Sequence, residues 1–88
     1  MKYRLLVAIE VIEILETLPP ARRNIIWNRL RQIAVSPGNF ADYRAKDATG
    51  REVDVNVFAG YAIRYWEDFT DRHVKILEIQ NADRGAMS

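Results

Sequence analysis

The sequence predicts a small α+β domain in which one strand and two helices precede an antiparallel run of strands. Two patterns carry this prediction. In the first half of the chain, apolar residues recur at three- and four-residue spacing, which is the period of an amphipathic helix. After residue 40 the period changes to two, which is that of a strand with two different faces. A chain of 88 residues has room for one hydrophobic core, so we expect a single domain.

The first half predicts a strand followed by a helical hairpin. The segment Lys2–Ala8 is rich in bulky apolar residues and is typical of a short buried strand. From Ile9 onward, apolar residues occupy one side of a helix and three glutamates the other. Pro19 ends this helix, and Pro20 suits the first turn of the next because the N–H that it lacks has no helical partner there. The expected buried stripe of the second helix is Ile26, Leu30, Ile33 and Ala34.

The second half predicts an antiparallel β-meander joined by short turns. We expect strands at Tyr43–Lys46, Val53–Phe58, Tyr61–Glu67 and His73–Gln80. In the second of these, valines alternate with Asp54, Asn56 and Phe58, so the valines lie on one face. We interpret the valine face as the one that packs on the helices. The other face would then stay open to solvent.

Composition excludes several classes of function. Cysteine is absent, so the chain has no disulfide, thiolate zinc site or cysteine nucleophile, and a cytoplasmic location fits. No segment is apolar and long enough to span a bilayer. His73 is the lone histidine and the glycines form no phosphate-binding loop, so no metal or cofactor is expected. Serine occurs only at Ser36 and Ser88, which disfavours a hydrolase triad.

The open sheet face is the candidate functional surface. On it we expect Asp54, Asn56 and Phe58 to neighbour Ala62, Arg64 and Trp66 of the next strand. A cation beside an exposed aromatic side chain can stack bases and hold phosphate, although the same face could bind a partner helix. Further basic residues near strands and turns are Arg44, Lys46, Arg51, Arg72, Lys75 and Arg84. The candidate target contacts are Arg44, Lys46, Arg51, Asn56 and Trp66.

The second helix region contains four arginines that are candidates for a second basic surface: Arg22, Arg23, Arg29 and Arg31. No acid interrupts them between Thr17 and Ala41, although the formal net charge of the chain is only +1. They are either a solvated helix face or a surface for a polyanion. The sequence leaves both interpretations open.

With these elements in order, the chain resembles the RelE/ParE toxins. The resemblance is carried by "LPPARRNIIWNRLRQIAVSPGNF", "GREVDVNV", "GYAIRYW" and "HVKILEIQNADR". These segments contain a Leu-Pro between the helices, a Pro after the second helix, a Gly-Tyr turn and a closing apolar strand. The similarity covers nearly the whole chain, so we expect one domain over residues 1–84, with a flexible tail over residues 85–88.

The resemblance implies the toxin half of a toxin–antitoxin pair, neutralised when an antitoxin segment wraps across it. Family members that cleave messenger RNA on the ribosome carry several basic residues on the open face, whereas the ParE branch lacks them and inhibits DNA gyrase. Here Asp54, Asn56, Ala62 and Ala82 stand near the positions where basic residues are usual. Displaced cations at Arg64 and Arg84, with His73 as a proton shuttle, form the hypothetical catalytic set. The alternative is a non-catalytic toxin-fold module that binds an antitoxin or another protein.

Overall fold

The computed structural model describes residues 3–82, and its elements follow the predicted order. In chain order they are β1 (Arg4–Val7), α1 (Ile9–Glu16), α2 (Pro20–Val35), the 3-10 turn η1 (Pro37–Phe40), β2 (Tyr43–Lys46), β3 (Glu52–Phe58), β4 (Tyr61–Asp68) and β5 (His73–Asn81). Neither helix of this part of the chain is long and apolar enough to cross a membrane. The predicted α+β class is confirmed.

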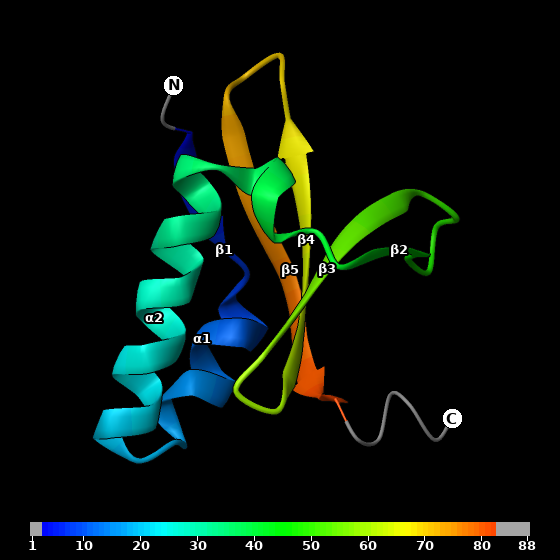
Figure 1. The fold of residues 1–88 in the computed structure, drawn as a ribbon. Coiled ribbons are helices and arrows are strands. Elements are labelled where there is room, and N and C mark those ends of the chain that lie inside the picture. Colours follow the sequence, from blue (N-terminus) through cyan, green and yellow to red (C-terminus); the bar gives the residue numbers. More distant parts are fainter. Residues whose placement is uncertain (1–2, 83–88) are drawn as a thin grey trace.

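The strands form one five-stranded sheet in the order β1-β5-β4-β3-β2. Strands β2 to β5 make the predicted antiparallel meander. Strand β1 pairs with β5 in parallel, with Arg4 opposite His73, and no local pattern in the sequence had indicated this pairing. Both helices lie against the same face of the sheet (Figure 1).

The core lies between the helices and that face. Val11 and Leu15 of α1 are fully buried, and so are the apolar residues of the α2 stripe. The predicted stripe is confirmed: Ile26, Leu30, Ile33 and Ala34 are all buried. The side chains that pack against the helices from the sheet are Ile63, Tyr65, Val74, Ile76 and Ile79. The Tyr65 hydroxyl also donates a buried hydrogen bond to the carbonyl oxygen of Pro37 at 2.6 Å, which ties η1 to the sheet.

A two-residue turn sets the course of β3 and β4. Phe58 pairs with Tyr61, and the intervening Ala59 and Gly60 have φ values of 54° and 84°. Two successive positive φ values give a turn whose twist matches that of the flanking strands. The left-handed conformation costs alanine about 1–2 kcal/mol. The hairpin of β2 and β3 curls away from the helices (Figure 1).

Candidate functional site

The register of β3 and β4 corrects the expected open face. Asn56 pairs with Ile63 and Val55 pairs with Arg64. Because paired residues share a face, Asn56 and Arg64 lie on opposite sides of the sheet. The expectation that Asn56 neighbours Arg64 and Trp66 is therefore wrong. The valines line the face away from the helices, which we call the outer face; its central residues are Val53, Val55, Arg64, Trp66, Lys75 and Glu78.

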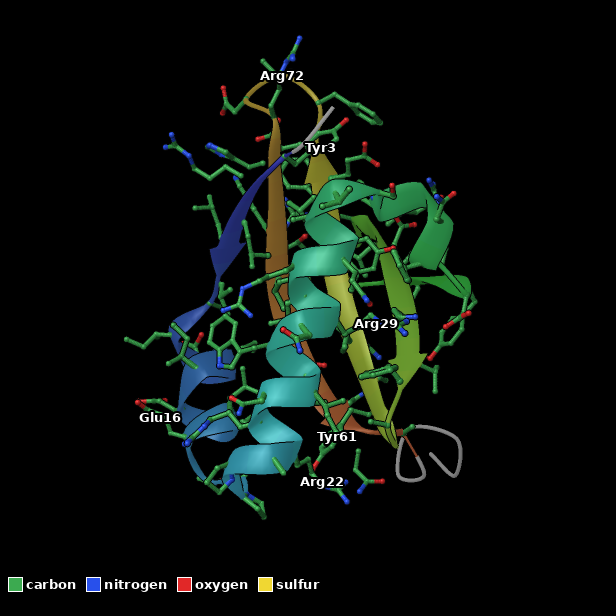
Figure 2. All side chains as sticks on the ribbon, turned by 60° about the vertical axis from the view of Figure 1, so that its left-hand side comes forward. Tyr3, Glu16, Arg22, Arg29, Tyr61 and Arg72 are labelled. Carbon is green, nitrogen blue, oxygen red and sulfur yellow. The ribbon has the colours of Figure 1, made fainter. Side chains whose placement is uncertain are left out.

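Asn56 lies beneath α2 and contacts Arg29 and Asp42, and we call Asn56 and Arg29 the clamp. The Asn56 side chain is only 3% exposed, and its Oδ1 accepts a 3.4 Å hydrogen bond from Arg29 Nη1. Its Nδ2 donates to Asp42 Oδ2 at 3.1 Å. The Arg29 guanidinium lies 4.7 Å from the ring centre of Phe40 and 3.9 Å from that of Phe58. Figure 2 shows Arg29 reaching from α2 toward the strands. Asn56 thus joins a helix to the sheet and is not open to a large partner.

A bulge shapes the outer face around Arg64. Arg64 pairs with Glu78 while Tyr65 pairs with Ile76, so Leu77 is an extra residue on β5. Leu77 and Glu78 both line a concavity of about 250 Å³ that also contains Val53 and Arg64. Arg64 Nε is buried without a hydrogen-bond partner and lies 3.6 Å from Glu78 Oε1. This ion pair is too long for a hydrogen bond, and the Nη groups of the partly exposed Arg64 side chain make no hydrogen bond within residues 3–82, so they can meet another acceptor.

Trp66 forms the aromatic centre of the outer face. The guanidinium of Arg51 lies 4.6 Å from its ring centre, and the Lys75 ammonium lies 5.0 Å away. Both distances are within the range of cation–π attraction. The structure therefore brings together the predicted residues Arg51, Arg64 and Trp66. Lys75, which the sequence marked only as a surface charge, joins them because it stands opposite Trp66 in the β4–β5 register.

Each cation of this cluster has a nearby carboxylate. Arg51 Nε lies 3.2 Å from Asp47 Oδ2, and Lys75 Nζ lies 3.6 Å from Asp68 Oδ2. A 2.7 Å hydrogen bond from the Thr49 hydroxyl, supported by backbone N–H donors of Thr49 and Arg51, lowers the pKa of Asp47 to about 2. Asp47 therefore stays charged and keeps Arg51 in place over the tryptophan.

The other predicted residues lie elsewhere. Arg44 points to the opposite face of its hairpin, where it contacts Glu52 and Asp54. Lys46 is exposed opposite Glu52. Arg84 falls outside residues 3–82.

His73 lies on the outer face but away from Arg64. It pairs with Asp68, four positions along β4 from Arg64, or about 13 Å of strand. Ligand atoms of Asp68, Asp71 and His73 lie within 4.8 Å of one another. However, Asp68 Oδ1 accepts hydrogen bonds from the backbone N–H groups of Thr70 and Asp71, and Oδ2 faces Lys75. These contacts explain the cluster as the cap of a turn.

Comparison with solved structures decides the fold. The archaeal RelE of a RelE–RelB complex from Pyrococcus horikoshii superposes with a TM-score of 0.78 over 96% of this chain and 99% of that one, at 20% identity. The chain has the RelE fold. A variant of the Escherichia coli toxin RelE in the free state, with two arginines replaced by alanine, gives a TM-score of 0.65 at 17% identity over 98% of this chain and 90% of that one.

The RelE fold is the fold that the sequence resemblance implied. No protein-family model matches the sequence, and no curated protein matches it either. At these identities the likeness concerns the backbone, so the roles of individual side chains rest on the geometry of this chain.

Proposed function

We propose that this chain is the toxin component of a toxin–antitoxin pair and that its outer face contacts RNA. The observation that carries the proposal is the cluster of Trp66 with Arg51 and Lys75 over its ring and Arg64 on the same face. Cations beside an aromatic ring hold the phosphates of a single strand while a base stacks on the ring. Two solved proteins of the RelE fold support the biological setting, one in complex with RelB and one named as a toxin.

In this proposal, the residues of the cluster contact the RNA one after another. The Arg64 side chain is 28% exposed, and its terminal guanidinium N–H groups offer the first contact for a phosphate. Two cations lie over Trp66, so a base stacks there once one of them turns toward the RNA backbone. Transfer of Lys75 from Asp68 to a phosphate keeps its charge compensated.

Cleavage of messenger RNA on the ribosome is the finer form of the proposal. It requires a base that removes the proton of the 2′-hydroxyl and an acid that protonates the leaving oxygen. His73 remains the predicted proton shuttle, and Arg84 remains a predicted cation for the phosphate charge. The distance of His73 along the strand from Arg64 makes RNA binding the better supported part.

Inducible expression in cells that lack any partner gene tests this function. We expect growth and protein synthesis to stop while plasmid supercoiling is unchanged. Arg64→Met and Lys75→Met should restore growth because each removes a phosphate contact. Arg31→Met removes an exposed arginine of α2, outside the outer face, and should remain toxic; loss of toxicity in this variant would place the RNA on the arginines of α2 instead. Loss of supercoiling with continuing translation would instead indicate a gyrase-directed, ParE-like toxin.

Each cation of the outer face is paired with a carboxylate, and this pairing favours a second candidate function. A non-catalytic RelE-fold module that binds an antitoxin or another protein needs no excess of positive charge on this face. Glu78→Gln separates the two, because freeing Arg64 should strengthen RNA binding by a toxin. Healthy cells after induction, with no RNA binding by either form, would favour the module. A neighbouring reading frame that encodes a DNA-binding antitoxin would favour the toxin.

A further inference from the structure

Strands β3 and β4 separate at one end and leave a notch. Their pairing begins with Asp54 opposite Tyr65, although β3 starts at Glu52 and β4 continues to Asp68. The notch between them holds about 130 Å³ and is lined by Arg44, Glu52, Asp54, Trp66, Glu67 and Phe69. Pockets for metabolites usually hold about 300–1,000 Å³. The notch is therefore too small for such a ligand and suits a single side-chain head group.

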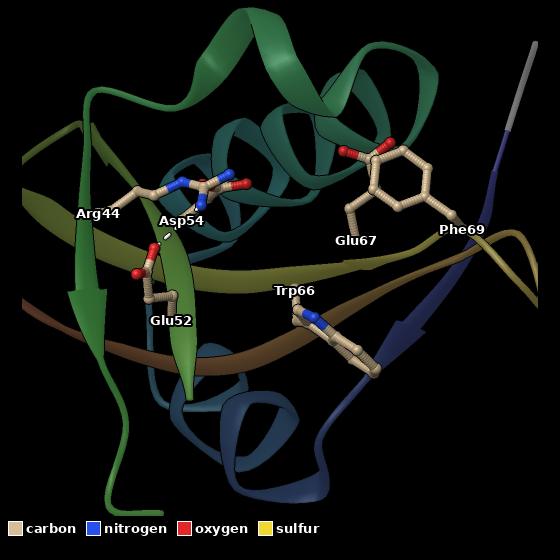
Figure 3. A pocket seen from close by; sticks show the side chains of 6 residues that line it. All are labelled: Arg44, Glu52, Asp54, Trp66, Glu67 and Phe69. Atoms are coloured by element: carbon tan, nitrogen blue, oxygen red, sulfur yellow. Dashed lines mark hydrogen bonds and ion pairs between the residues drawn. The ribbon is translucent and has the colours of Figure 1, made fainter. Parts of the chain in front are cut away.

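The notch carries an excess of negative charge. Three carboxylates line it, against the single guanidinium of Arg44. Arg44 reaches from β2 to two carboxylates of β3 (Figure 3). Its Nη1 lies 3.0 Å from Glu52 Oε2, and its Nε lies 3.2 Å from Asp54 Oδ1. Among residues 3–82, Glu67 has no cation within ion-pair distance. The lining of the notch thus has a net negative charge that favours a second cation.

The carboxylates of the notch also affect two neighbouring tyrosines, Tyr65 and Tyr3. Burial raises the pKa of Tyr65, and the carboxylates of Asp54, Glu67 and Asp42 raise it further. A hydrogen bond to Glu67 raises the pKa of Tyr3. Negative charge disfavours phosphate in the notch, so the notch lies outside the proposed RNA surface although Trp66 borders both.

Aromatic side chains form the walls beside Glu67, which has no ion-pair partner among residues 3–82. Trp66 and Phe69 stand on the side of the notch opposite Arg44 (Figure 3). Phe69 is 73% exposed, although an edge contact with Tyr3 holds its ring. Carboxylates next to aromatic rings suit a planar guanidinium, which can form paired hydrogen bonds and stack at the same time.

We propose that the notch binds an arginine side chain from an extended segment of another protein. The guanidinium pairs with Glu67 beside Trp66, while apolar residues of the segment cover the exposed ring of Phe69. Arg44 already shows how a guanidinium is held by the other two carboxylates. This inference goes beyond the proposed function, because it requires neither toxicity nor RNA binding.

Amide chemical shifts of the whole chain test the notch with two peptide probes. The first is acetyl-Leu-Arg-Leu-amide, and the second carries glutamine in place of arginine. We expect the arginine peptide to shift the Trp66 indole and the Glu67 and Phe69 amides in a saturable way at millimolar concentration, and the glutamine peptide to bind several-fold more weakly. Equal shifts with both peptides, or no saturable shift, would overturn the proposal.

Two substitutions with opposite expected effects strengthen the test. Glu67→Gln removes the unpaired carboxylate and should weaken the arginine peptide about two- to fivefold. Arg44→Gln frees Glu52 and Asp54 and should strengthen it by a similar factor of about two to five. Glu13→Gln on the exposed side of α1 is the matched control and should leave the affinity unchanged. Weaker binding by Arg44→Gln would contradict the notch as a cation site, whatever the outcome of the growth assay.

Discussion

Arg29 and Arg64 lie on opposite faces of the same sheet, and in each the Nε atom is buried without a hydrogen-bond partner. Arg29 lies between two phenylalanine rings and bonds to a buried asparagine. Arg64 has a looser contact with Glu78, and 28% of its side chain is exposed. The surroundings of an arginine therefore decide its role: Arg29 joins a helix to the sheet, and Arg64 can still engage a ligand.

The same substitution at both positions gives the largest expected contrast. Arg29→Met removes the stacked guanidinium and leaves Asn56 Oδ1 buried without its donor, so we expect the free energy of unfolding to fall by about 1–3 kcal/mol. Chemical denaturation measures this change. A loss equal to that of Arg31→Met, which changes an exposed α2 arginine, would show that the clamp is not structural.

A substitution of Asn56, the strand residue of the clamp, should also lower the free energy of unfolding. Asn56→Ala removes the acceptor of Arg29 and the donor to Asp42, and we expect a loss of about 1–2 kcal/mol in denaturation experiments. Because Asn56 and Arg29 act together, the double variant Asn56→Ala, Arg29→Met should lose less than the sum of the two single changes. Additive losses would separate the two residues.

Arg64→Met should leave stability almost unchanged. Methionine keeps an apolar stem over Val53 and removes an ion pair that is partly exposed, so the change should lie within about 0.5 kcal/mol. Binding of a single-stranded RNA oligonucleotide should weaken, and its dependence on the logarithm of salt concentration should fall by about one unit. A large loss of stability would place Arg64 in the same class as Arg29.

The smallest expected effect concerns pH at the edge of the outer face. The pKa of Asp47 is lowered to about 2, so its contribution is complete above the ordinary carboxyl value and disappears as pH falls through about 2. The Thr49 and Arg51 amide shifts should therefore titrate with a midpoint near pH 2. A midpoint near the ordinary value would show that the Thr49 hydrogen bonds do not hold the loop and Arg51 in place.

Local patterns in the sequence predicted most of the elements. Pro19 and Pro20 separate the helices as expected, and the Ala59-Gly60 turn joins β3 to β4. The alternation in β3 showed that the valines and Asn56 lie on different faces. An alternating pattern is the same for either orientation of the strand, so it does not say which face meets the helices. That choice depends on the long-range contact of Asn56 with Arg29, which no local pattern records.

The candidate site was predictable only in part, for a related reason. Residue type pointed to Arg51, Arg64 and Trp66, and the structure gathers them. Counting outward from the turn between β4 and β5 places Lys75 opposite Trp66, so this member carried a usable signal. The bulge next to Arg64 breaks the alternation of β5, because its buried residues Val74, Ile76 and Ile79 are two and then three positions apart, but the adjacent apolar pair Ile76 and Leu77 hides the position of the break in the sequence. The pairing of Arg64 with Glu78 therefore required the structure.

The parallel pair of β1 and β5 also orders the events of folding. Arg4 and His73 pair although they are far apart in the chain, so β1 has no partner until β5 has been synthesised. Such distant contacts are costly to close and tend to slow folding. During synthesis, β1 and the helices beside it must wait for β5, so the nascent chain cannot assemble this edge of the sheet piece by piece.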